Sequence, residues 1–228
     1  MTQPLDDLLD DGVAVFADEL GTLLGGVFAD APNVVVERLD DRRVVRPETP
    51  ISLRAQGLRL GRLDISVRCR VDSSRSFLAV EKSTMKLSAD VDRAPIVRWD
   101  YERDAHSKPT AHIQVHGHRG ALSHLLARAG HSTPHSMESL HLPVGGARFR
   151  PCVEDVIEFL VRDCGMDAEP GWEHLVRGGR ARWRRYQAMT VVRDMPETAA
   201  TALSRLGYTV LPPAGGHPMD EPKALHCW

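Results

Sequence analysis

The spacing of apolar residues changes twice along the chain. Apolar side chains recur every three to four positions over residues 4–27, at every second position over residues 33–118, and again at helical spacing beyond 118. A period near 3.6 predicts amphipathic helices, and a period of two predicts strands with one buried face. The pattern therefore predicts an N-terminal helix, a β region and a helical C-terminal region.

The β region predicts about six strands. In the segment GRLDISVRCRVD, the apolar side chains of Leu63, Ile65 and Val67 alternate with polar ones, as expected for an antiparallel sheet with one face against a core. Because a run of strands is followed by a run of helices, the order favours an α+β fold over a parallel α/β sheet. The predicted strand segments are NVVVERLD, PISLRAQ, GRLDISVRCRVD, SFLAVEKSTMKLSA, PIVRWDYERD and PTAHIQVHGH.

Helical spacing after residue 118 predicts helices over 120–130, 151–165, 172–193 and 196–206, the third weakened by Gly178 and Gly179. We expect one compact domain in three parts. Residues 1–139 form the N-terminal helix and the sheet, residues 140–210 form a helical C-terminal subdomain, and residues 211–228, rich in Pro and Gly, form a tail.

Composition narrows the class of protein. The chain has 228 residues, 42% hydrophobic and 26% charged, with a formal net charge of −2, which is typical of a soluble globular protein and gives no general case for nucleic acid. The four cysteines are widely spaced and form no CxxC motif, so neither a zinc ribbon nor a disulfide framework is predicted. The first residues are acidic and no apolar run approaches bilayer length, so we expect a reduced cytoplasmic protein with no membrane partner.

Charge is unevenly distributed. Residues 1–30 contain acidic side chains and no Lys or Arg, whereas RGGRARWRRYQ, residues 177–187, is rich in arginine. Arginines interleaved with aromatic residues suit an RNA backbone with stacked bases. They suit equally a solvated helix whose Trp faces the core, or one that docks the acidic N-terminal helix. The candidate nucleic-acid-binding residues are Arg180, Arg182, Trp183, Arg184 and Arg185.

Histidine is concentrated in one region. Eight of the eleven histidines lie within residues 106–141, and PTAHIQVHGHRG places His112, Gln114, His116 and His118 at alternate positions. If this segment and PIVRWDYERD form a hairpin, Arg98, Asp100 and Glu102 lie across from the histidines on one polar face.

That polar face predicts acid–base chemistry. His112 and His116 are the acid and base candidates, Asp100 or Glu102 would orient one of them, and Arg98 would bind phosphate, which together could cleave a phosphodiester without a metal. A half-exposed hairpin also needs a polar face for solvation alone, so the charges do not require a catalytic function.

A divalent metal is a further alternative. His112 and His116 stand roughly 13 Å apart along a strand, too far to share one ion. Only His116 and His118 are close enough, and a third ligand would have to come from elsewhere. No other cofactor is predicted.

Two local resemblances add expectations. HIQVHGH, residues 112–118, resembles the strand motif of the histidine triad nucleotide hydrolases and transferases. His112 and His116 match the outer positions, Gln114 occupies the middle one, and Gly117 and His118 depart from the apolar ending. This resemblance implies a nucleophilic role for His116.

Residues 95–118, with VRWDYERD, His106 and PTAHIQVHG, resemble the core of TumE-type toxins of toxin–antitoxin systems. LHLPVGGARFRPCVEDVIEFLV, residues 140–161, is typical of an actinobacterial family that the rest of the chain resembles. The TumE-like stretch implies a toxin–antitoxin or phage-defence setting and a cognate antitoxin-like partner.

Three hypotheses follow. The first is a toxin-like ribonuclease, or another nucleic-acid-acting protein, that uses the His/carboxylate/Arg face. The second is a binding module without chemistry that docks a protein partner through its basic helix and acidic N-terminus. The third is a metal-dependent or histidine-triad-like nucleotide hydrolase. The sequence predicts no oligomeric state.

Overall fold

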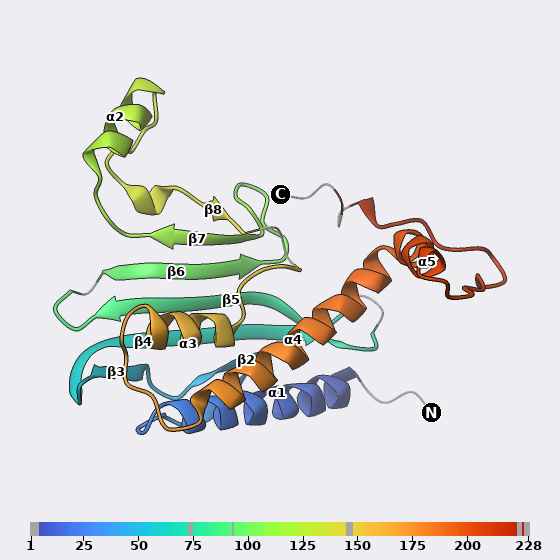
Figure 1. The fold of residues 1–228 in the computed structure, drawn as a ribbon, viewed down its shortest axis with the longest axis horizontal. Helices are drawn as coiled ribbons and strands as arrows, with labels where there is room; N and C mark the ends of the chain where they lie inside the picture. The colour runs from blue at the N-terminus through green and yellow to red at the C-terminus, as the bar shows by residue number, and fades with distance from the viewer. Residues whose placement is uncertain (1–4, 73–74, 93, 145–147, 223–224, 226–228) are drawn as a thin grey trace.

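One antiparallel sheet organises the chain. The computed structural model describes residues 5–72, 75–92, 94–144, 148–222 and 225, and this part contains an eight-stranded sheet with helices before and after it (Figure 1). The predicted α+β class is confirmed. The strands are β1 Val34–Leu39, β2 Arg42–Pro47, β3 Ile51–Ala55, β4 Leu58–Val71, β5 Leu78–Ala89, β6 Pro95–Glu102, β7 Ala111–Val115 and β8 Leu142–Pro143.

The strand order is β1-β2-β4-β5-β6-β7-β8, with β3 also paired to β4. The long strand β4 makes this possible, because its first part pairs with β3 and its later part, around Val67, pairs with β2. The remaining neighbours are joined as successive antiparallel pairs from β4 through β7. Alternate side chains therefore face the same side of the sheet, except at the register shifts in the pairs β3–β4, β4–β5 and β5–β6.

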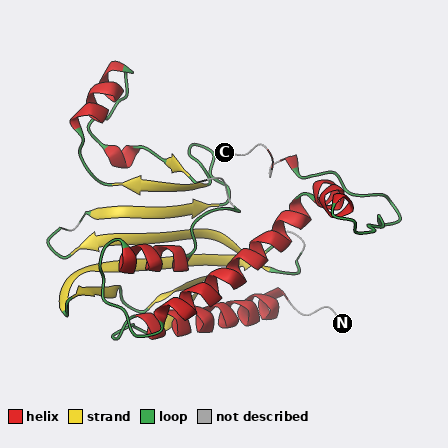
Figure 2. Cartoon of the chain, in the orientation of Figure 1, coloured by secondary structure: helices red, strands yellow, loops and turns green. Residues whose placement is uncertain are grey.

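Three helices lie on one side of the sheet: α1 Leu5–Val27, α3 Val153–Arg162 and α4 Trp172–Asp194 (Figure 2). We call this side the covered face. It holds the core, in which Leu63, Met85 and Trp99 pack beneath the helices, with the Trp99 ring 5.8 Å from that of Phe159 on α3. The other side, which we call the open face, carries the intervening polar residues. The remaining helices are α2 Gly120–Arg128, η1 Met137–Ser139 and α5 Pro196–Arg205.

The Gly178-Gly179 pair does not interrupt α4. Gly179 is buried against α3, where a Cβ atom would lie 2.2 Å from Oε1 of Glu154. The glycine therefore has a packing function, since a side chain at this position would force the Glu154 side chain to move.

Strand β2 is absent from the sequence prediction of about six strands. Its second residue, Arg43, has a polar side chain, but the structure buries it, with only 2% of the side chain exposed. Its guanidinium donates to Asp10 of α1, Nε to Oδ1 at 2.6 Å, and to the backbone oxygens of Asp40 and Arg42. A buried arginine held by a helix hides the alternation that would have identified this strand.

The region expected to form a tail contacts α5 over part of its length. The carboxylate of Asp220 accepts hydrogen bonds from the backbone N–H groups of Glu197 and Thr198 at 3.0 and 3.2 Å, which caps the N-terminus of α5. The N–H of Glu221 donates to the carbonyl of Asp194 at 2.7 Å. Among the described residues, no helix has the length and apolar character that a membrane span requires.

Candidate functional site

The predicted hairpin is confirmed as the pair β6 and β7. Its register places Asp100 opposite His112 and Arg98 opposite Gln114, all on the open face. β5 flanks β6 on its other edge, and there Thr84 stands opposite Asp100, also on the open face. We call the following group the histidine cluster: Thr84, Arg98, Asp100, His112, Gln114 and His141.

Asp100 is the anchor of the histidine cluster. Thr84 Oγ1 donates to Asp100 Oδ1 at 2.8 Å, and a guanidinium nitrogen of Arg98 lies 3.1 Å from Oδ2. Only 8% of the Asp100 side chain is exposed. The arginine therefore neutralises the carboxylate, and the threonine fixes its orientation.

His112 is held in one tautomer. Its Nδ1 lies 2.9 Å from the carbonyl oxygen of Pro109, which can only accept, so Nδ1 carries the proton. Nε2 faces Asp100 Oδ2 at 3.9 Å and has no hydrogen bond among the described residues. The ring packs edge-on against His141 with 4.7 Å between centroids. His112 thus presents an acceptor nitrogen toward a carboxylate in a closed site.

A segment from η1 to β8, residues 136–143, covers this part of the open face. β8 pairs with β7, with Pro143 opposite His112, and Gln114 Nε2 donates to the carbonyl of Glu138 at 2.8 Å. The His112 side chain is consequently 0% exposed. Burial lowers the pKa of His112, an effect that His141 reinforces and that the Pro109 hydrogen bond and Asp100 oppose. Burial also lowers the pKa of His141.

The remaining acid–base candidates lie around the cluster. Glu102 pairs with Lys108 at 3.2 Å and Lys82 at 3.4 Å, and these cations lower the pKa of its carboxyl, Lys108 most strongly. His116 follows β7, where its N–H donates to the carbonyl of Ile96 at 2.8 Å and its Nε2 has no partner among the described residues. Four residues of strand separate His112 from His116 by roughly 13 Å, a spacing that does not by itself bring both rings to one phosphate.

His118 is exposed, with its Nε2 3.5 Å from Ser123 Oγ. Within the described ranges, no group of three or more His, Cys, Asp or Glu side chains is placed to hold a metal ion. The pairing of His116 and His118 as ligands therefore gains no third donor from the parts of the chain that are described.

The candidate nucleic-acid-binding residues of α4 lie on the covered side of the sheet. The guanidinium of Arg150 stacks on Tyr101, whose side chain faces the helices, and on Trp183 of α4, at 3.8 and 4.8 Å from the ring centroids. The sheet therefore separates Trp183 from the histidine cluster, because Asp100 and Tyr101 are consecutive residues that point to opposite faces. One RNA segment could contact both groups only by passing around an edge of the sheet.

The arginines of α4 are not equivalent. Arg180 is bound by Asp155 and Glu158 of α3, with its Nε 2.7 Å from Asp155 Oδ1. Arg182 pairs with Glu19 of α1 at 3.3 Å, so the arginine-rich helix does dock the acidic N-terminal helix within the chain. Arg184 and Arg185 are exposed. Only part of the predicted nucleic-acid-binding set is thus turned to solvent.

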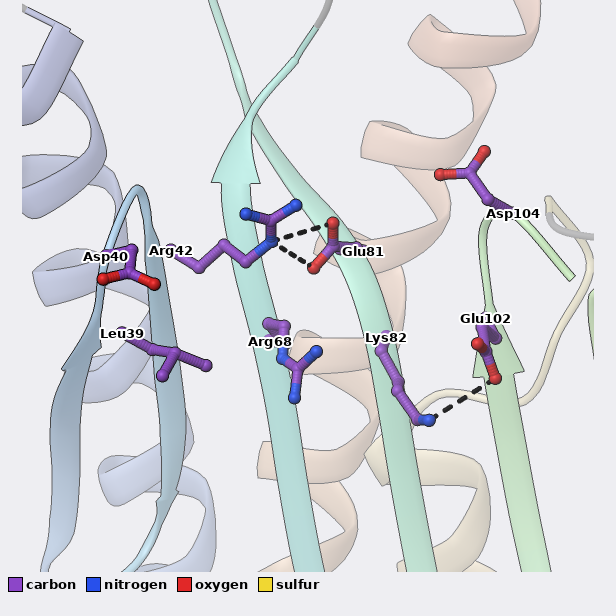
Figure 3. Close-up of a pocket in the computed structure, with 8 residues that line it drawn as sticks. All are labelled: Leu39, Asp40, Arg42, Arg68, Glu81, Lys82, Glu102 and Asp104. Atoms are coloured by element: carbon purple, nitrogen blue, oxygen red, sulfur yellow. Dashed lines mark hydrogen bonds and ion pairs between the residues drawn. The ribbon is translucent and has the colours of Figure 1, made fainter.

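Sequence reasoning did not find a hollow at the other end of the open face. It measures about 410 Å³ and opens between β2, β4, β5 and the end of β6 (Figure 3). No linear motif marks it, because its residues come from separate strands and turns. The residues that line it are Leu39, Asp40, Arg42, Arg68, Glu81, Lys82, Glu102 and Asp104.

Comparison of the chain with protein-family models, with curated proteins and with solved structures gives no match.

Proposed function

We propose that the protein is a nucleic-acid-acting protein that holds single-stranded RNA on the open face of its sheet. The observation that carries this proposal is the surplus of cations on that face. Across β1, β2, β4, β5 and β6 the open-face acids are Glu37, Asp64, Glu81, Asp100 and Glu102, and the open-face cations number eight. These cations are Arg42, Arg46, Arg62, Arg68, Arg70, Lys82, Lys86 and Arg98.

A surface with this charge can bind a polyphosphate chain through counterion release. Neighbouring strands lie about 4.8 Å apart, so side chains on adjacent strands can contact successive phosphates of an extended strand. The helices α1, α3 and α4 lie on the opposite side of the sheet (Figure 1). This arrangement favours backbone contacts, which would make binding tolerant of sequence and sensitive to salt.

The histidine cluster would supply the chemistry of a toxin-like ribonuclease. It lies on the same face, and Arg98 stands at its junction with the cation-rich part. In the proposed reaction His116 exchanges a proton with the substrate. His112 would take part only after residues 136–143 move aside and the two rings come closer together than their strand spacing of roughly 13 Å. A cognate antitoxin-like partner that covers the open face would inhibit such a protein.

The binding proposal is tested with a fluorescent RNA 12-mer and two double variants of equal charge change. Arg62→Glu with Lys86→Glu alters the open face, and Arg184→Glu with Arg185→Glu alters the helix side. We expect the open-face pair to weaken binding by at least tenfold and to lower the slope of log K against log salt by about 2, measured by anisotropy at several salt concentrations. The helix-side pair should have a much smaller effect.

A larger loss in the helix-side pair would contradict binding on the open face. In the same preparations, RNA incubated with and without EDTA tests cleavage, with His116→Ala as the variant. Cleavage that persists in EDTA and disappears in His116→Ala supports the ribonuclease proposal. RNA that stays intact in every condition contradicts it, and leaves binding as the only function on this face.

A second candidate function is docking of a protein partner by the end of α4 and by α5. The observation that favours it is a set of large apolar side chains that are about half or more exposed there. If the wild-type protein fails to bind RNA in the experiment above, this second function becomes the favoured one. The exposed residues are Tyr186, Met189, Val192, Leu206, Tyr208 and Leu211.

A further inference from the structure

The hollow on the open face is created by an irregularity in β5. Arg68 pairs with Lys82, but the next residue of β4, Cys69, pairs with Val80, so Glu81 is an extra residue without a partner across the strands. Such a bulge turns two neighbouring side chains toward one face. Glu81 and Lys82 consequently both project into the hollow (Figure 3).

Two of the three cations in the hollow have an acidic partner. Arg42 Nε donates to both oxygens of Glu81, at 3.0 and 2.8 Å, and Glu81 also lies 3.8 Å from Arg70 on β4. Lys82 lies 3.4 Å from Glu102. The acids Glu81 and Glu102 are therefore occupied by cations from neighbouring strands.

Arg68, the third cation, has no such partner. Its Nε is buried without a hydrogen bond, and no ion pair joins it to any described residue. Its direct cross-strand neighbour is Lys82, so two positive side chains face each other across the strand pair. Like charges in this position repel, and a buried guanidinium nitrogen without an acceptor is unfavourable. One negative group placed between Arg68 and Lys82 would remove both costs.

The other acids of the hollow do not fill this position. Asp40 lies in the turn between β1 and β2 and Asp104 follows β6, so they stand at opposite rims, while the Arg68 guanidinium lies between them (Figure 3). They leave the centre of the hollow to a ligand.

We propose that the hollow is a binding site for one phosphate group. Arg68 would donate two parallel hydrogen bonds to two phosphate oxygens, and Lys82 would approach a third as a compact charge. The phosphate can come from a small phosphate compound or from the backbone of a nucleic acid. The inference goes beyond the proposed function, because Arg68 lacks an acidic partner and faces Lys82 whether or not RNA binds the rest of the face.

The test uses the full chain and three probes: inorganic phosphate, adenosine 5′-monophosphate, and the RNA 12-mer with unphosphorylated ends. Binding is measured by isothermal titration calorimetry for the small probes and by anisotropy for RNA. Arg68→Gln removes the proposed anchor. Arg59→Gln is the matched control, because Arg59 is on the same strand but pairs with Asp90 at 2.8 Å, outside the hollow.

We expect saturable binding of at least one small probe by the wild type and by Arg59→Gln, and at least a tenfold weaker affinity in Arg68→Gln. Lys82→Gln provides a second variant, with a smaller loss in the same direction. Equal affinity in Arg68→Gln and wild type, or no saturable binding of either small probe, would overturn the proposal.

The RNA arm separates the two sources of phosphate. Weaker RNA binding in Arg68→Gln, together with competition by inorganic phosphate, assigns the site to the nucleic-acid backbone. Binding of adenosine monophosphate without binding of RNA assigns it to small phosphate compounds, in which case the phosphate site stands and the proposed RNA function fails.

Discussion

The two faces of the sheet are built from alternate residues of the same strands, yet they are stabilised in different ways. On the covered face, Leu63 and its neighbours are excluded from water by three helices, and the buried guanidinium of Arg43 is held by Asp10. On the open face, side chains such as Lys86 and Asp64 pair with each other across strands while they stay partly exposed. The covered face is stabilised by close packing of apolar side chains and by exclusion of water. The open face is stabilised by ion pairs between neighbouring strands.

The largest expected effect tests that contrast directly on β4. Leu63→Ala removes a side chain with 0% exposure and should lower the free energy of unfolding by about 2–5 kcal/mol, because it leaves a cavity under the helices. Ser66→Ala, three residues along and exposed on the open face, should change it by less than about 0.5 kcal/mol. Urea unfolding of both variants measures the difference. Similar losses would mean that a partner or a second copy covers the open face.

The next effect concerns the buried charge. Asp10→Asn removes the nearest carboxylate of Arg43 and leaves the guanidinium, 2% exposed, with only the exposed Asp6 at 3.7 Å as a counter-ion. We expect a loss of stability smaller than that of Leu63→Ala and clearly larger than that of Asp18→Asn, an exposed acid on the same helix. Arg43 also lowers the pKa of Asp10, so this contribution should disappear in the wild type as the pH falls through that lowered pKa. Thermal melts of the wild type, Asp10→Asn and Asp18→Asn between pH 7 and pH 2 measure these effects. An equal loss of stability in the two variants would contradict the prediction.

The smallest effect concerns the histidine cluster, the part of the open face that is buried. Burial lowers the pKa of His112 below its value in the unfolded chain, so the unfolded chain binds more protons once the pH drops below about 6.5. Stability should therefore fall with acidification in that range, with a slope of at most about 1.4 kcal/mol per pH unit from this residue. His112→Gln should flatten the slope, and His124→Gln, on the exposed surface of α2, should leave it unchanged. Urea unfolding between pH 7.5 and pH 5 measures both.

The sequence was sufficient for the features that depend on local periodicity. The alternation in β4 and β6, and the apolar spacing of the four long helical segments, determine which elements form and which residues enter the core. The facing of Asp100 and His112 could also be predicted, because a hairpin with a short connection leaves few registers. Charge also gave the docking of the arginine-rich helix on the acidic N-terminal helix as one of three alternatives, and the pair of Arg182 with Glu19 shows that this contact forms.

The features that depend on contacts between distant segments could not be predicted in this way. His112 is closed over by residues 136–143, which follow it after a helix and a loop, so no local pattern shows its burial. Trp183 lies on the opposite side of the sheet from the histidine cluster because α4 packs on the covered face. The bulge at Glu81 adds one residue to β5, but the apolar pattern of that strand does not reveal it. The hollow on the open face depends on this bulge. The histidine motif alone therefore did not show where its side chains lie. The register of the sheet and the position of residues 136–143 were also needed.

The bulge at Glu81 also makes the hollow depend on chain length more than on residue identity. A chain one residue shorter at this point would keep the same core and a regular strand, since Val80 and Lys82 would still alternate. It would lose the carboxylate that holds Arg42 and Arg70, and the lining of the hollow would change from four acids and three cations to three of each. A single-codon deletion could thus change which ligands this face attracts while leaving the fold intact, a kind of change that comparison of substitutions alone would miss.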